Sequence, residues 1–304
     1  MIRIHNYACR NPIINTASKL MLRKRLSTAS SSQPLVTTTW NEETKIATLS
    51  MNRPPVNSLS LELCQAISNG IRDIEAHGDG AKVMILQSST PVFCAGLDLN
   101  ELYQPRRLEE FWTSFQQLYL DLFGTRLATI AAISGQAPAA GCMLAMATDY
   151  RIIQRPSSAS SRSNSVTIGL NEAKFGIVAP PWMADLMVHT LGQRQAELSL
   201  MLGTLYSPKE ALAIGLVDVV LDDDDDMAEA CQKIAMQWAQ IPSHSRIASK
   251  QLMRKPLLEK LISSRQQDLD LFCQFCLSEQ VQANLGMYLQ SLKKKQGKKE
   301  EENK

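Results

Sequence analysis

The sequence predicts an α/β fold in which strands and helices alternate along the chain and pack in layers. Short β-branched or apolar segments with the length of strands recur at residues 44–51, 82–87, 130–133 and 150–153. Apolar residues at helical spacing lie between them, at residues 59–75. This alternation favours a layered α/β domain over an all-α or an all-β one. With 304 residues, 44% of them hydrophobic and 20% charged, the chain can bury a substantial core.

Turn residues and helical periodicity justify the remaining elements. The first strand must end at residues 52–55, because Pro54 and Pro55 remove the N–H donors that a sheet needs. Helices are expected at residues 141–147, 227–240, 245–254 and 259–292. The polar, low-complexity residues 155–165 predict a surface loop, and the acidic run 222–226 predicts a solvated turn.

Three regions are expected along the chain: a targeting or disordered segment at 1–32, a catalytic core at 33–241 and a helical region with a lysine-rich tail at 242–304. No acidic residue precedes Glu42, whereas arginine, lysine and serine are frequent there. That composition is typical of a mitochondrial transit peptide and predicts a protein of the mitochondrial matrix. A merely disordered basic tail is the alternative.

Composition also bears on partners and cofactors. A net charge of +2 does not by itself predict a nucleic-acid partner, and no apolar run approaches the roughly 20 residues of a membrane span, so no membrane insertion is expected. Seven scattered cysteines do not form a disulfide pattern. Cys273 and Cys276 make one CxxC without a second pair, and the four histidines are isolated. We therefore expect no metal site.

Three segments at predicted strand ends carry the residues that could do chemistry. In the first, residues 93–99, Gly96 permits a tight turn, Asp98 can cap a following helix, and the N–H of Leu97 is left to face a ligand. In the second, residues 133–142, small residues precede an apolar helix and leave free amides at its start. Turns of this kind are more often structural than functional.

The third segment, residues 168–177, places Glu172 in an otherwise apolar stretch. The neighbours expected to bury it are apolar: Ile168, Leu170, Phe175 and Ile177. If the carboxyl group is buried there, its pKa should rise toward neutrality.

Together these segments resemble a known family. FCAGLDL, PAAGC, TDYRI and GLNEAKFGI, in that order, are similar to the crotonase (enoyl-CoA hydratase/isomerase) superfamily. PPVNSLSLEL, GIVAPPW and MYLQSLKKKQGKK resemble its mitochondrial Δ3,Δ2-enoyl-CoA isomerase branch. The resemblance extends over residues 36–299. It implies a ClpP/crotonase-like fold of repeated ββα units, with a C-terminal helical region that forms a homotrimer.

The resemblance also implies a mechanism. The backbone N–H groups of Leu97 and Ala140 would hold the thioester oxygen of an acyl-CoA, and Glu172 would carry a proton from C2 to C4. No cofactor is implied beyond the coenzyme A of the substrate. The substrate-contacting positions are Ala95, Gly96, Leu97, Asp98, Leu99 and Ala140. Residues 55–59 would also border the CoA moiety.

Two positions depart from the wider family pattern. Hydratases of this fold carry a second glutamate where this chain has Met143, and a thioether cannot do acid/base work, so isomerisation is favoured over hydration. Relatives often have glycine at the position of Ala140, whose methyl group could crowd the thioester or alter the turn. The length of the loop at 155–165 could affect chain-length preference, although a harmless insertion is the simpler interpretation.

Several alternatives stay open at this point. Another crotonase-type reaction such as hydration is one, and a non-catalytic or RNA-binding member, suggested by the basic tail and a pI near 8.1, is another. Lys293, Lys294 and Lys295 could meet the CoA phosphates or form a solvated helix end. A set of apolar residues near the C terminus could be buried within the protomer or against a partner: Leu269, Phe272, Phe275, Cys276, Met287 and Leu289.

Overall fold

The computed structural model describes residues 33–76, 80–155, 166–222, 224–283 and 285–287. The described residues from Pro34 onward form one compact unit. The targeting segment expected at 1–32, nearly all of the loop at 155–165, Leu289 and the three C-terminal lysines lie outside the described residues. The division between a core and a helical region at residue 242 stays a prediction.

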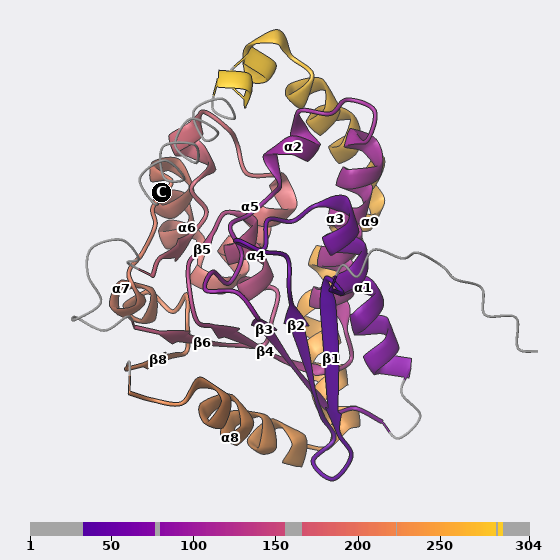
Figure 1. Cartoon of the computed structure of the whole chain (residues 1–304), viewed down its shortest axis with the longest axis vertical. Helices are drawn as coiled ribbons and strands as arrows, with labels where there is room; N and C mark the ends of the chain where they lie inside the picture. The colour runs from indigo at the N-terminus through magenta and orange to yellow at the C-terminus, as the bar shows by residue number, and fades with distance from the viewer. Residues whose placement is uncertain (1–32, 77–79, 156–165, 223, 284, 288–304) are drawn as a thin grey trace, which may run out of the picture. The chain divides into compact units, whose positions relative to one another are not determined.

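A six-stranded sheet with the order β1-β2-β3-β4-β6-β8 lies at the centre of this unit (Figure 1). β1 (Val36–Asn41) runs antiparallel to β2 (Ile46–Met51), and all later neighbours in the sheet are parallel. The parallel strands after β2 are β3 (Val83–Ser88), β4 (Ala128–Ile133), β6 (Tyr150–Gln154) and β8 (Val219–Leu221). All six residues of β4 are buried, as expected for a parallel strand covered on both faces.

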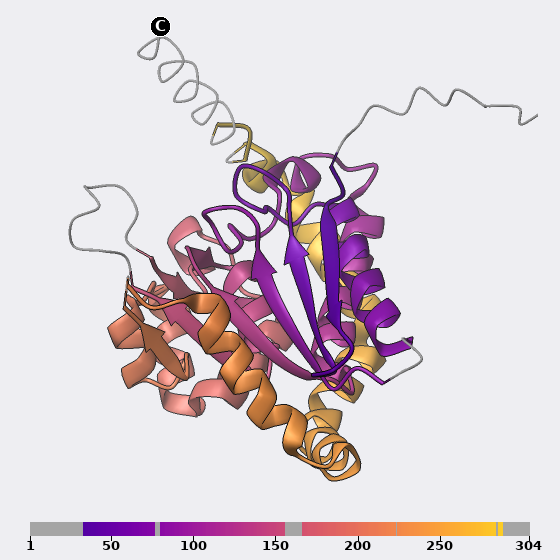
Figure 2. The same ribbon diagram turned by 60° about the horizontal axis from the view of Figure 1, so that its bottom comes forward.

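Helices cover both faces of the sheet. On one face, α8 (Met227–Gln240) packs its apolar side on residues of β2, β3, β4 and β6 (Figure 2). The other face is covered by α1 (Leu61–Ala76), α3 (Leu108–Gly124), α4 (Ala140–Met146) and α5 (Pro181–Leu191). No helix was predicted over α3, although its buried residues recur at helical spacing. Among the described helices, none has both the length and the apolar composition that crossing a membrane requires.

Smaller elements connect these layers and bracket the predicted site. They are α2 (Leu99–Leu102), β5 (Ala137–Pro138), β7 (Ile168–Gly169), the 3₁₀ turn η1 (Glu172–Phe175), α6 (Gln193–Leu202) and α7 (Pro208–Ala213). β5 and β7 pair in parallel as a second, two-stranded sheet. This sheet joins the segment after β4, which contains β5, to the segment that leads to Glu172, which contains β7.

One helix, α9 (Ser243–Cys276), spans the helix predicted at 245–254 and the first half of the one predicted at 259–292. After a turn at 277–278 the chain is helical again at 279–283 and 285–287. The prediction of a break was wrong, because the helix continues through Pro256. Buried contacts hold α9 on both sides of the proline: Arg254 pairs with Asp149 at 2.8 Å, and Asp268 accepts a hydrogen bond of 2.8 Å from the Trp112 indole. These contacts outweigh the hydrogen bond that a proline removes from a helix.

The apolar residues at the end of α9 are buried mostly within the protomer. The ring of Phe272 stacks on Trp112 with 3.4 Å between centroids, and Cys276 is buried in the core. Leu269 and Phe275 pack against the same core. Met287 differs, since 62% of its surface is exposed.

Candidate active site

The three predicted segments follow the carboxyl ends of β3, β4 and β6, which are neighbouring parallel strands. In an open α/β sheet, parallel strands have their carboxyl ends on the same side of the sheet, and ligands usually bind just beyond those ends. The segment after β6 is held near these carboxyl ends by β7, which pairs with β5 from the segment after β4.

The first turn is held by a short backbone ladder. Ala95 N–H donates to Val56 O at 3.0 Å, Leu59 N–H donates to Gly96 O at 2.8 Å, and Asp98 N–H donates to Leu59 O at 2.9 Å. This is a parallel bridge between Leu59 and Leu97. The bridge uses the groups of the residues on either side of Leu97, so the N–H of Leu97 points away from Leu59. Within the described residues it donates no backbone hydrogen bond.

The second turn lies directly against the first. A Cβ atom built on Gly96, whose φ is +94°, would lie 3.6 Å from the Ala140 nitrogen. One built on Gly141 would lie 2.2 Å from the Cys94 carbonyl oxygen, so only glycine allows this approach. Ala140 is the first residue of α4, and no described residue accepts a hydrogen bond from its N–H. The two predicted N–H donors therefore lie on adjacent pieces of backbone.

Backbone strain in the second turn falls beside Ala140, not on it. Ala139 has φ 51° and ψ −124°, a conformation that favours glycine, while its N–H donates to Gly169 O at 2.8 Å. Ala140 is helical and 1% exposed. Its methyl group, for which the sequence left open that it crowds the thioester or alters the turn, belongs to a residue buried in the core.

Glu172 lies at the start of η1, two residues after the buried Leu170. Its Oε2 atom is enclosed by protein and has no hydrogen-bond partner among the described residues. Burial raises the pKa of Glu172 to about 7, and a hydrogen bond from its own backbone offsets part of the rise. No neighbouring charged side chain in the described chain contributes to this shift. The carboxyl group can therefore both accept and donate a proton near neutral pH.

The apolar surroundings of Glu172 differ in part from expectation. Ile168 and Leu170 are buried and Ile177 is half-buried, whereas Phe175 is 56% exposed. Helix α4 is a closer neighbour: burial raises the pKa of the Cys142 thiol, and the charge of Glu172 adds to that rise. Met143, the next residue, is completely buried.

Asp98 contributes to the site through its backbone position. Its side chain is buried, accepts a hydrogen bond from Asn100 N–H at 2.9 Å as the cap of α2, and pairs with Arg53. The predicted cap is therefore present, and the carboxylate is committed to structure. Ala95 likewise uses its N–H within the ladder, and Leu99 begins α2.

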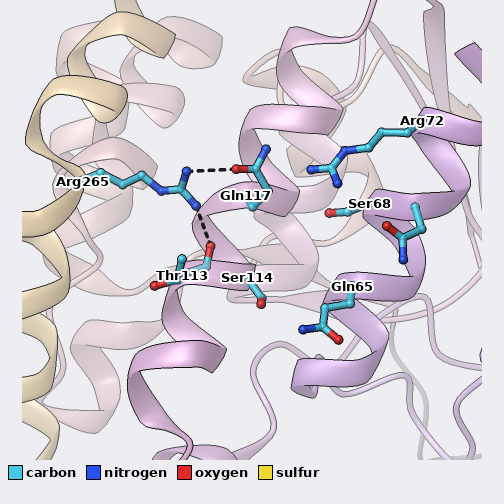
Figure 3. A pocket seen from close by; sticks show the side chains of 8 residues that line it. Gln65, Ser68, Arg72, Thr113, Ser114, Gln117 and Arg265 are labelled. Carbon is cyan, nitrogen blue, oxygen red and sulfur yellow. Dashed lines mark hydrogen bonds between the residues drawn. The ribbon is translucent and has the colours of Figure 1, made fainter.

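A polar hollow of about 380 Å³ lies away from these residues, between α1 and α3 (Figure 3). Arg265 of α9 borders it and donates to Gln117 Oε1 and Thr113 O, both at 2.9 Å. None of the predicted site residues lines this hollow. The sequence offered no signal for it, because its walls come from three helices that are far apart in the chain.

Comparison with known proteins places the chain in a family. Residues 41–299 match the family model described as enoyl-CoA hydratase/isomerase. The chain belongs to the enoyl-CoA hydratase/isomerase family. The family resemblance read from the motifs is thereby confirmed.

Within the enoyl-CoA hydratase/isomerase family, the chain is 40% identical to mitochondrial enoyl-CoA delta isomerase 1 of Mus musculus, over 83% of this chain and 85% of the relative. It is 37% identical to the Homo sapiens protein of the same name, over 83% of this chain and 82% of the relative. These matches agree with the isomerase branch that the motifs indicated.

Solved structures of the family confirm the predicted crotonase fold. The crystal structure of human mitochondrial delta3-delta2-enoyl-CoA isomerase matches with a TM-score of 0.80 and 35% identity, over 86% of this chain and 99% of the other. An enoyl-CoA hydratase from Bacillus halodurans matches with a TM-score of 0.73 at 21% identity, over 84% of this chain and 100% of the other, which shows the fold alone.

Proposed function

We propose that this chain is a Δ3,Δ2-enoyl-CoA isomerase that converts 3-cis- or 3-trans-enoyl-CoA to 2-trans-enoyl-CoA in the β-oxidation of unsaturated fatty acids. The observation that carries the proposal is the Glu172 carboxyl group, whose Oε2 atom is enclosed without a hydrogen-bond partner among the described residues and whose pKa is raised by burial to about 7. The names of the mouse and human relatives support the same activity.

The backbone donors act on the thioester oxygen. When C2 loses a proton, negative charge moves onto that oxygen, and the N–H groups of Leu97 and Ala140 are free to donate to it. Because both donors are held in place before the reaction, each should stabilise the transition state by about 3–4 kcal/mol.

One carboxyl group completes the proton transfer. Glu172 accepts the proton from C2, and the electron pair left behind is shared along C4, C3, C2 and the thioester. The protonated Glu172 then returns that proton to C4, so the double bond moves from C3–C4 to C2–C3 with no net change in atoms or electrons. The reaction needs no cofactor, because the base that takes the proton also returns it.

Met143 distinguishes isomerisation from hydration. It is fully buried on α4 and directly follows Cys142, whose pKa is raised in part by the charge of Glu172. A thioether at this position offers no second base to activate water, so hydration of a 2-enoyl-CoA should be slow. A hydratase of the same fold is the alternative function.

Location and assembly extend the proposal. The curated mouse and human relatives are named as mitochondrial, which supports placing this protein in the mitochondrial matrix. We also propose that it forms a homotrimer, to be checked by light scattering. The acyl-CoA thioester is the only ligand proposed, with no nucleic acid.

The decisive experiment follows a medium-length 3-enoyl-CoA with the purified chain starting at residue 31. Wild type should form 2-trans-enoyl-CoA rapidly with little hydration, and Glu172→Gln should lose about 10²- to 10⁴-fold in kcat. Glu229→Gln, on the exposed side of α8, is the matched control and should keep full activity. An inert wild type that still binds acyl-CoA would contradict the proposal and favour a binding role, as would RNA binding with a steep salt dependence.

A further inference from the structure

Asn57 is a buried polar residue to which the mechanism assigns no role. It lies between β2 and α1, none of its surface is exposed, and its φ is +49°. A buried side-chain amide costs stability unless its donors and acceptor are satisfied, so its contacts show what it is held for.

The contacts of Asn57 reach both segments that frame the first turn. Its Oδ1 accepts a hydrogen bond of 2.7 Å from Arg53 N–H, which closes its own loop. Its Nδ2 donates across to Ser88 Oγ at 2.7 Å and Thr90 Oγ1 at 3.1 Å. The same nitrogen lies 3.2 Å from the carbonyl oxygen of Phe93 and 3.4 Å from that of Val92, so these four acceptors share its two hydrogens.

The contact with Phe93 matters most because of its position. Phe93 is fully buried and lies four residues before Leu97. Asn57 Nδ2 donates to the Phe93 carbonyl oxygen, and no turn or loop backbone N–H of the described residues does so. Ser88 and Thr90, by contrast, also bond to each other and to the Val92 carbonyl.

From Phe93 onward the chain enters the ladder that orients the first turn. Ala95 donates to Val56, the residue just before Asn57, and Leu59 pairs with the residues on either side of Leu97. Asn57 therefore fixes the start of this ladder, and the ladder decides where the Leu97 N–H points.

We propose that Asn57 is a positioning residue for the oxyanion-binding N–H of Leu97, acting by holding the Phe93 carbonyl and the 56–59 backbone in register. The inference rests on the proposed function, since it assumes that the Leu97 N–H meets a thioester oxygen. It predicts that changes at Asn57 weaken stabilisation of the transition state more than binding of the acyl-CoA.

Two variants separate the hydrogen bonds from the backbone conformation. Asn57→Asp keeps the shape and tolerates positive φ, but places a carboxylate oxygen where Nδ2 now donates to Phe93. Asn57→Gly keeps the backbone freedom and removes all side-chain bonds. Thr129→Val is the matched control: Thr129 is also fully buried and hydrogen-bonded, but it lies near the amino-terminal end of the central strand β4, whereas the candidate site lies beyond the carboxyl ends of the strands.

Steady-state isomerase kinetics are combined with the absorption of a bound 2,4-dienoyl-CoA, whose band moves to longer wavelength when donors polarise its carbonyl. Both Asn57 variants should lose about 10- to 100-fold in kcat with KM changed by less than about threefold, and should shift the probe band less than wild type. Thr129→Val should lower only the unfolding midpoint. Wild-type kcat and band shift in folded Asn57 variants would overturn the inference, as would equal kinetic losses in Thr129→Val.

The same measurements separate this inference from the proposed function. If wild type shifts the probe band but does not isomerise 3-enoyl-CoA, the isomerase proposal fails, and the band shifts of the variants still decide the role of Asn57. If wild type does neither, both are overturned. If a variant does not fold, the other variant supplies the comparison.

Discussion

At the scale of single residues, the Glu172 carboxyl group couples activity to pH. The ionised form is needed to take the C2 proton, so kcat/KM should rise with pH and level off above the pKa of about 7. A pH–rate profile of wild type with a 3-enoyl-CoA measures this directly. A profile that is flat between pH 5.5 and 8.5, chosen to bracket the pKa by about 1.5 units on each side, would contradict the assignment.

The same residue should also make stability depend on pH. Its folded-state pKa of about 7 exceeds the ordinary value of 4.5, so the folded protein holds a proton that the unfolded chain releases. The contribution of the protonated Glu172 to the free energy of unfolding is complete below pH 4.5 and is lost as pH rises through 7. Glu172→Gln should therefore gain stability relative to wild type between pH 5 and pH 8, by up to about 3 kcal/mol. Urea unfolding at the two pH values tests this, with Glu229→Gln expected to show no such gain.

Ala139 offers a test of backbone strain beside the site. A non-glycine residue at φ 51° and ψ −124° destabilises the folded state by about 1–3 kcal/mol. Glycine removes this strain, but it also gives the unfolded chain more conformational entropy, which lowers stability by about 0.5–1 kcal/mol. Ala139→Gly should thus stabilise the protein by about 1 kcal/mol in urea unfolding. Ala137→Gly, in β5 with ordinary φ, is the control and should destabilise it. Equal destabilisation by both would show that Ala139 is not strained.

At the scale of elements, the Asp149 carboxylate is one of the buried groups that attach α9 to the rest of the protein. Asp149 receives Lys250 Nζ at 2.8 Å and Arg254 at 2.8 Å, and its side chain is 10% exposed. Asp149→Asn would leave two buried cations without their partner and should cost about 3–5 kcal/mol of unfolding free energy. The exposed Asp270→Asn, on the same helix, should change it by less than about 0.5 kcal/mol. Equal effects would mean that apolar packing alone holds α9.

The same helix shows why local sequence patterns predicted the presence of helices and strands better than the residues at which they begin and end. The strands at 44–51, 82–87, 130–133 and 150–153 are present with small shifts, because their apolar residues are buried wherever the strand lies in the sheet. The helix at 227–240 has the predicted bounds. The continuity of α9 through Pro256 could not be predicted, because it depends on partners such as Asp149 and Trp112 more than 100 residues away.

At the scale of the whole molecule, the unit that begins at Pro34 holds every described element, so we expect it to fold without the residues before it. A chain starting at residue 34 should unfold within about 2 °C of the full-length protein, since no described core residue is removed. Thermal unfolding of the two chains measures this, and a loss of cooperativity in the shorter one would contradict it.

Import into isolated mitochondria should also shorten the full-length protein, whereas a chain that stays full length and outside the mitochondria would refute the matrix location.

The sequence by itself determined the α/β class, most strands, the family and Glu172 as the candidate base, because hydrophobic periodicity and motif spacing are local properties of the chain. Only the tertiary structure decided that the turns carrying Leu97 and Ala140 lie against each other, that Glu172 Oε2 is enclosed, and that Asn57 donates to the Phe93 carbonyl. The physical reason is that desolvation and hydrogen-bond geometry depend on groups brought together from distant strands. A pKa near 7 therefore belongs to the folded site and cannot be read from the residues around Glu172 in sequence.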